Sequence, residues 1–81
     1  MRIHNQDNDT KVDKVTIFLT LTEAKTFQQG LIELIEEPKW NHKHISSDDY
    51  KKEITICIYD PSALDEYGFH ERAIKLIRED S

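Results

Sequence analysis

Two segments of strict alternation constrain the fold of this chain most. Every second residue is aliphatic from Val15 to Thr22, and the pattern recurs over residues 51–59. A period of two in β-branched and aromatic residues predicts strands with one buried face and one open face. The aliphatic positions are Val15, Ile17, Leu19 and Leu21 in the first segment and Ile54, Ile56 and Ile58 in the second. Strands buried on both faces would be apolar throughout, so we expect a sheet that helices cover on one face only.

A spacing of three and four residues predicts a helix between these strands. Thr22 is the expected N-cap, Glu23 lies in the first turn, and Pro38 marks the end. The expected buried stripe comprises Ala24, Phe27, Leu31, Leu34 and Ile35. Gly30 interrupts the stripe at a cost of about 1 kcal/mol relative to alanine, which suggests close packing against a strand.

The remaining elements complete an α+β fold. A short strand at residues 42–46 and the turn Ser46–Asp49 would form a hairpin with the second long strand, and a last helix would start near Phe69. We predict a two-layer sandwich in β-α-β-β-α order, with a three- to four-stranded, mostly antiparallel sheet and two helices packed on one face. Residues 1–14 are expected to be a flexible or edge-strand N-terminal segment, and residues 15–81 a single α+β domain.

Charge and cysteine content narrow the classes of partner. Eleven Lys and Arg oppose 16 Asp and Glu, for a net charge of −5, which disfavours nucleic acid and anionic membranes. No apolar run reaches the length of a membrane span. Cys57 is the only cysteine, and the opening residues do not resemble an export signal. We therefore expect a cytoplasmic protein whose partner is another protein or a second copy.

The sequence predicts no enzyme. Only two glycines are present, and there is no phosphate-binding loop, GxSxG or CxxC motif. Cys57 lies between Ile56 and Ile58 in the middle of a predicted strand, which is typical of an inert packing cysteine. We expect neither catalytic residues nor a cofactor.

The open face of the sheet is the candidate interaction surface. Strand parity places Phe18, Cys57 and Tyr59 on the uncovered side, and exposed apolar patches on small domains often mark protein interfaces. Trp40 is a further candidate anchor, but its place just after Pro38 favours packing back on the preceding helix.

Two histidines on the same face form a candidate metal site. The His42-x-His44 spacing projects both imidazoles to one side of a strand, where they could bind zinc, copper or nickel with Cys57 or Asp48 as further ligands. Two histidines without a second ligand pair are also typical of a polar strand surface.

Several short runs resemble a family of small bacterial proteins that are known only as uncharacterised. They are Leu19-Thr-Leu-Thr-Glu-Ala24, Leu34-Ile-Glu-Glu-Pro38, His42-x-His44, Asp49-Tyr50 and Glu53-Ile-Thr-Ile-Cys-Ile-Tyr-Asp60. The resemblance covers residues 15–60. It implies a bacterial, cytosolic, compact α+β domain and transfers no catalytic residue.

We therefore predict a small protein–protein interaction module, dimeric through the open sheet face. One alternative is an acidic immunity- or antitoxin-like protein that meets a basic partner. The other is a protein that binds a small ligand or a metal at His42 and His44.

Overall fold

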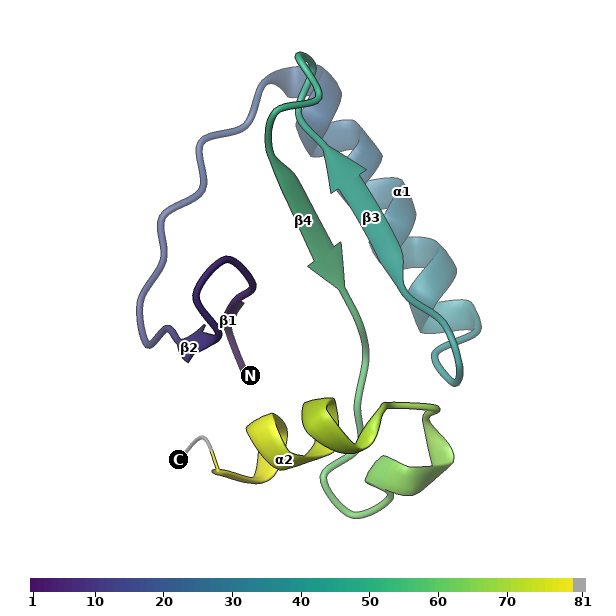
Figure 1. Ribbon diagram of the computed structural model, residues 1–81. Helices are drawn as coiled ribbons and strands as arrows, with labels where there is room; N and C mark the ends of the chain where they lie inside the picture. Colours follow the sequence, from purple (N-terminus) through teal and green to yellow (C-terminus); the bar gives the residue numbers. More distant parts are fainter. Residues whose placement is uncertain (80–81) are drawn as a thin grey trace. The chain divides into compact units, whose positions relative to one another are not determined.

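The α+β class is confirmed by the computed structural model, which describes residues 1–79. These residues form two α-helices, one short 3-10 helix and four short strands in two antiparallel pairs (Figure 1). The chain divides into two compact units. One unit joins Met1–Ile17 to the chain from Phe69 onward, and the other is Phe18–Gly68.

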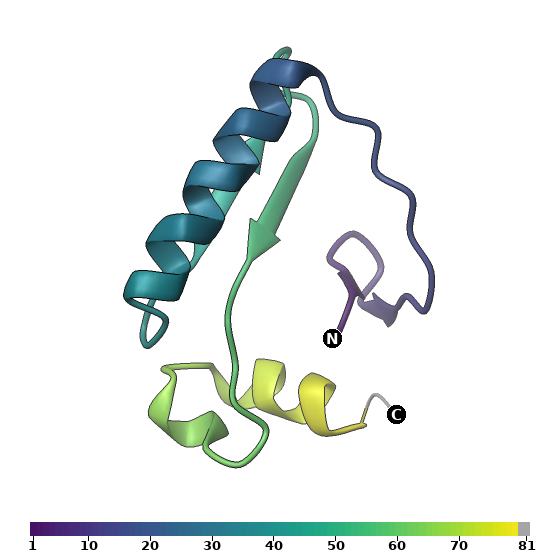
Figure 2. The ribbon, with the colours of Figure 1, turned by 180° about the vertical axis from the view of Figure 1, so that it is seen from behind.

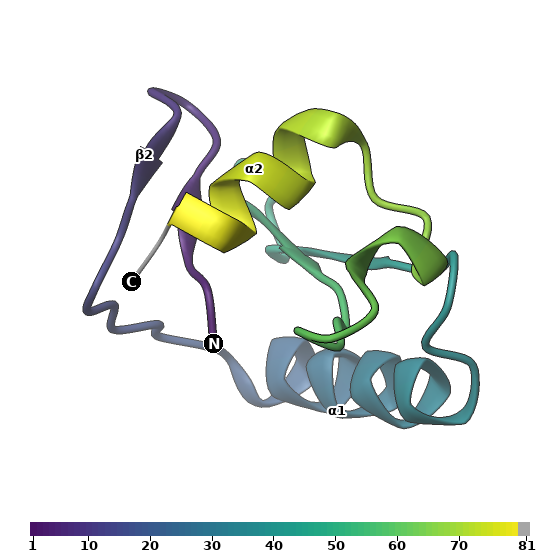
Figure 3. The same ribbon diagram turned by 90° about the horizontal axis from the view of Figure 1, so that it is seen from below.

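The first unit is built on a minimal hairpin and a helix (Figure 3). Strand β1 (His4–Asn5) pairs with β2 (Thr10–Lys11), and His4 Nε2 lies 2.9 Å from Asp9 Oδ1 across the turn. Helix α2 (Glu71–Glu79) is tied to this hairpin segment at both ends. Arg72 forms an ion pair with Asp9, and Arg2 Nε donates to the Ile77 carbonyl at 2.8 Å.

The second unit consists of a long helix on a β-hairpin (Figure 2). Helix α1 (Leu21–Glu36) packs on β3 (Lys43–Ser46), which pairs antiparallel with β4 (Glu53–Ile56). A 3-10 helix, η1 (Leu64–Glu66), follows. Three buried side chains from α1, β3 and η1 form the core of this unit: Leu34, Ile45 and Leu64.

The predicted hairpin of residues 42–59 is confirmed, with shorter strands. Ser47 N donates to the Lys52 carbonyl at 2.9 Å and closes the connection between β3 and β4. The predicted end of α1 before Pro38 is also confirmed. The last helix begins at Glu71, two residues after Phe69.

The predicted strand Val15–Thr22 is not formed. Residues 14–20 have no strand partner, and residues from Leu21 onward belong to α1. The described residues therefore contain two sheets of two strands each, and the three- to four-stranded sheet is not confirmed. The reason is local, because the helix begins two residues earlier than expected and its cap takes Thr20 out of the alternating pattern.

Candidate functional site

A four-bond cluster fixes the start of α1 against the hairpin turn. Thr20 is the N-cap, because its Oγ1 accepts from Glu23 N at 3.1 Å while Glu23 Oε1 accepts from Thr20 N at 2.8 Å. This reciprocal pair is a capping box. Asp48 joins it twice: its backbone N donates to Glu23 Oε2 at 2.7 Å, and its Oδ2 accepts from Thr20 Oγ1 at 2.8 Å. The cluster sets which side of α1 faces the hairpin.

The electrostatics of this cluster favour a charged Glu23. Backbone hydrogen bonds from Thr20 and then Asp48 lower the pKa of the Glu23 carboxyl, and they outweigh the opposing effect of desolvation. The carboxylate therefore holds both partners as an ion rather than as a neutral acid.

The face of α1 that meets the hairpin is narrow. Leu34 is fully buried, and Gly30 is buried against β3. A Cβ on Gly30 would lie 3.5 Å from Lys43 Cβ and 3.7 Å from Ile45 Cδ1, so the helix backbone approaches the strand closely. The predicted packing of Gly30 against a strand is confirmed.

One side of α1 remains apolar and exposed. Leu31 and Ile35 were expected in the buried stripe, but they are 39% and 70% exposed because a two-stranded hairpin covers only part of the helix. Leu21 is 72% and Ile32 is 44% exposed. These four positions fall within about 100° of one another on a helix of 3.6 residues per turn. We call Leu21, Leu31, Ile32 and Ile35 the apolar flank.

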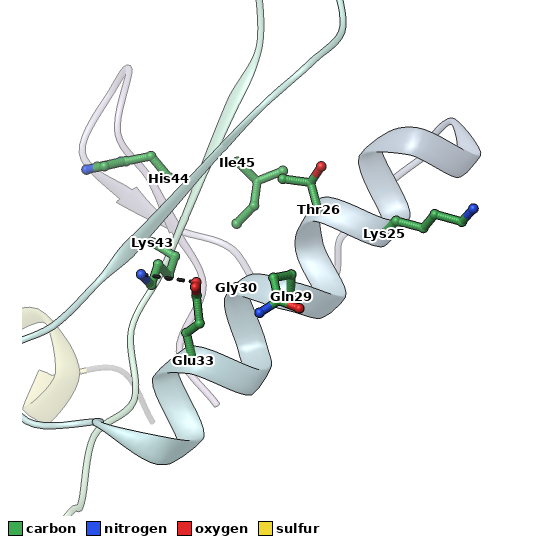
Figure 4. Close-up of a pocket in the computed structure, with 8 residues that line it drawn as sticks. All are labelled: Lys25, Thr26, Gln29, Gly30, Glu33, Lys43, His44 and Ile45. Atoms are coloured by element: carbon green, nitrogen blue, oxygen red, sulfur yellow. Dashed lines mark ion pairs between the residues drawn. The ribbon is translucent and has the colours of Figure 1, made fainter.

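The opposite side of α1 borders a groove whose exposed lining is mostly apolar (Figure 4). The groove has a volume of about 390 Å³. Its lining comprises Lys25, Thr26, Gln29, Gly30 and Glu33 from α1 and Lys43, His44 and Ile45 from β3. Lys43 Nζ and Glu33 Oε2 lie 3.2 Å apart across it.

The structure brings His42 and His44 together, as the spacing predicted. Their rings are 4.7 Å apart at an interplanar angle of 75°. His44 Nδ1 lies 2.8 Å from Thr55 Oγ1 and 2.6 Å from Glu53 Oε1 on the paired strand. Over residues 1–79, no group of three or more His, Cys, Asp or Glu side chains is arranged to hold a metal ion. A metal role for the two histidines stays a prediction.

Phe18, Cys57 and Tyr59 were predicted to share one sheet face, but they do not lie on a common sheet. Phe18 is 91% exposed in the segment before α1, while Cys57 and Tyr59 follow the end of β4. Partial desolvation raises the pKa of the exposed Cys57 thiol, which favours the neutral form over a nucleophilic thiolate. Trp40 is 76% exposed, and its ring lies against Gly68 in the segment after η1.

This geometry was compared with known proteins. No family model, curated protein or solved structure matches the chain. In the part of the chain that the structure describes, no helix is long and apolar enough to cross a membrane.

Sequence reasoning missed both surfaces of α1. Leu31 and Ile35 of the apolar flank were placed in the core because alternating spacings of three and four residues do not say how much of a helix the neighbouring sheet can cover. The groove has no sequence signature, because its α1 wall consists of common surface residues. A signal for its position was present in Gly30, where α1 and β3 approach each other closely.

Proposed function

We propose that the protein is a small interaction module that self-associates through the apolar flank of α1. The observation that supports this is the exposure of Leu21, Leu31, Ile32 and Ile35 on one side of one helix. Large exposed apolar side chains that gather on one side of a helix are more typical of an interface than of the surface of a small monomer.

A second copy is the occupant that fits this flank best. Antiparallel pairing of two α1 helices would set each flank against its equal, which is the self-complementary geometry of a two-fold dimer. The flank carries no charged residue, so pairing two copies requires no charge to be buried.

The same proposal includes a third strand in the sheet of the associated protein. Residues 15–19, which precede the cap of α1, alternate as a strand does, and Val15 and Ile17 are about half exposed. In the described chain, the outer edge of β4 has no strand partner. A sheet of three strands, formed when this segment pairs with β4, is proposed for the associated protein. We further propose a cytoplasmic, non-enzymatic role, in line with the single cysteine. A bacterial origin is part of the proposal only because the resemblance to small bacterial proteins implies it.

The experiment measures molar mass in solution by light scattering over a range of protein concentrations. Wild type is expected to approach twice the monomer mass of 9.6 kDa as concentration rises. The double variant Leu31→Gln/Ile35→Gln should remain monomeric, because glutamine keeps the helix but removes the apolar surface.

The matched control is the double variant Thr22→Gln/Glu36→Gln. Both positions are exposed on α1 but lie outside the apolar flank. The control should associate like wild type. A wild type that stays at 9.6 kDa throughout would refute self-association, and association that persists in Leu31→Gln/Ile35→Gln would move the interface away from the flank.

A further inference from the structure

The face of the β3–β4 hairpin that points away from α1 carries a pair of histidines. Ile45 is buried and points toward α1, whereas the exposed side chain of His44 points away from it (Figure 4). His42 lies two residues before His44, so strand alternation puts both on the same side. The centres of the two rings are 4.7 Å apart. Two imidazoles on one tetrahedral zinc ion, each with its nitrogen at about 2.0–2.1 Å, have their centres roughly 5 Å apart. The distance between the rings therefore suits a shared ion.

The paired strand fixes which nitrogen of His44 is free. His44 Nδ1 lies 2.6 Å from Glu53 Oε1 and 2.8 Å from Thr55 Oγ1. An ionised carboxylate can only accept a hydrogen bond, so Nδ1 carries the hydrogen and donates it to Glu53. The lone pair of the neutral imidazole is then on Nε2. Histidines that bind metals typically have this arrangement, because a carboxylate on the other ring nitrogen fixes the ring orientation and makes the ligand more basic.

His42 is able to turn a nitrogen toward the same ion. Its ring meets the His44 ring at an interplanar angle of 75°, and no hydrogen bond or ion pair from the described residues holds its ring nitrogens. The further ligands considered from the sequence do not join the pair. The Asp48 carboxylate accepts from Thr20 at the start of α1. Partial burial raises the pKa of the Cys57 thiol, and the thiolate is the form that binds metals. The two histidines would therefore hold the ion alone and leave its other positions to water.

We propose that His42 and His44 bind a divalent transition-metal ion through imidazole nitrogens, with Glu53 as the outer partner that holds His44 in place. Imidazole suits zinc, copper and nickel, whereas magnesium and calcium prefer oxygen ligands. The site lies within the unit Phe18–Gly68 and uses no residue of the apolar flank. It goes beyond the proposed self-association, and each of the two can fail without the other.

The test is a titration of the full chain with Zn²⁺, followed by NMR of the histidine ring nitrogens. One ion per chain is expected, with a shift of His44 Nε2 while Nδ1 keeps its hydrogen. His42→Ala and His44→Ala should each weaken binding by at least about tenfold, because loss of an outer partner alone typically costs about 10–100-fold. The matched control His70→Ala, at an exposed histidine outside the hairpin, should bind zinc like wild type. Mg²⁺ at the same concentration should shift neither histidine of the pair.

Two further variants test the outer partner and the independence of the site. Glu53→Gln keeps an acceptor but removes the charge, so it should weaken zinc binding by about tenfold. Its matched control is Glu66→Gln, at an exposed glutamate that is paired with Lys39, and this variant should bind like wild type. Leu31→Gln/Ile35→Gln should also bind zinc like wild type, because the site is complete in one copy.

Several results would overturn the proposal. They are an absence of zinc-induced shifts at His42 and His44, equal affinity of wild type and His42→Ala, coordination through His44 Nδ1, and equal shifts with Mg²⁺. Wild-type affinity in Glu53→Gln would show that the carboxylate does not support a ligand, and loss of zinc binding in Leu31→Gln/Ile35→Gln would show that one copy is not sufficient. Either result would also overturn it.

Discussion

The Glu23 carboxylate accepts a hydrogen bond from the backbone N–H of Asp48 at 2.7 Å, and this contact joins the first turn of α1 to the connection between β3 and β4. The same carboxylate caps its own helix through Thr20 N. The Glu23 side chain therefore both caps α1 and holds the helix against the hairpin. This contact orients the apolar flank and the groove side of α1.

Acid should weaken the fold through this contact. The pKa of Glu23 in the folded chain lies below its ordinary value of 4.5, so the unfolded chain binds the proton more readily. The stabilisation is fully present above 4.5 and is lost as the pH falls through the lower pKa of the folded state. Urea unfolding of wild type and of Glu23→Gln at neutral and acidic pH gives the free energy of unfolding of each protein. The free-energy difference between the two should shrink on acidification, and a difference independent of pH would contradict the role of the charge.

Leu34 and Leu31 should respond very differently to truncation. Leu34 is fully buried, so Leu34→Ala should lower the free energy of unfolding by about 2–5 kcal/mol. Leu31→Ala, on the apolar flank of the same helix, should cost less than about 1 kcal/mol in dilute protein, where α1 is not covered by a second copy. Chemical denaturation at low concentration gives both values. Similar losses in the free energy of unfolding for the two variants would mean that α1 packs on the hairpin through a different side.

Gly30→Ala should stabilise the protein. Alanine is favoured over glycine in a helix by about 0.5–1 kcal/mol, and the added Cβ would meet Lys43 and Ile45 at ordinary contact distances of 3.5–3.7 Å. Thermal unfolding should show a higher midpoint. A lower midpoint would indicate that α1 and β3 lie closer together than the structure places them.

Gly68→Ala should have the opposite effect. Gly68 has a φ of +79°, which side chains rarely adopt, and a Cβ there would overlap the Trp40 ring. We expect a loss of about 1–3 kcal/mol in the free energy of unfolding. The double variant Trp40→Ala/Gly68→Ala separates the two causes of this loss. It removes the overlap with the Trp40 ring and leaves only the backbone strain at residue 68. No change in Gly68→Ala would contradict this placement of Trp40.

The sequence predicted the hairpin and the end of α1 well, because each has a strong local signal. Alternating isoleucines specify β4 and a proline terminates the helix. The predicted start of α1 was two residues too late, because the N-cap is Thr20 and not Thr22. Thr20 and Glu23 have the spacing of a capping box, but Thr22 was taken as the N-cap and Thr20 was left in the predicted strand. An alternating pattern indicates that a segment can be a strand, but it does not determine whether the segment pairs with another strand, and residues 14–20 pair with none in the described structure.

The candidate surfaces were less predictable than the elements. His42 and His44 are adjacent, as expected, because their spacing alone determines it. Phe18 could be placed with Cys57 and Tyr59 only if its segment joined the sheet. Which side of α1 is covered depends on the width of the hairpin and on the contact between Glu23 and Asp48, and neither follows from helical periodicity.

Intermolecular contacts between methyl groups test the central claim most directly. An isotope-filtered NOE experiment on a mixture of ¹³C-labelled and unlabelled protein detects only contacts between copies. Self-association through the apolar flank predicts such contacts among the methyl groups of Leu21, Leu31, Ile32 and Ile35. An associated sample without intermolecular contacts at these four residues, or a sample that shows no intermolecular contacts at high concentration, would contradict it.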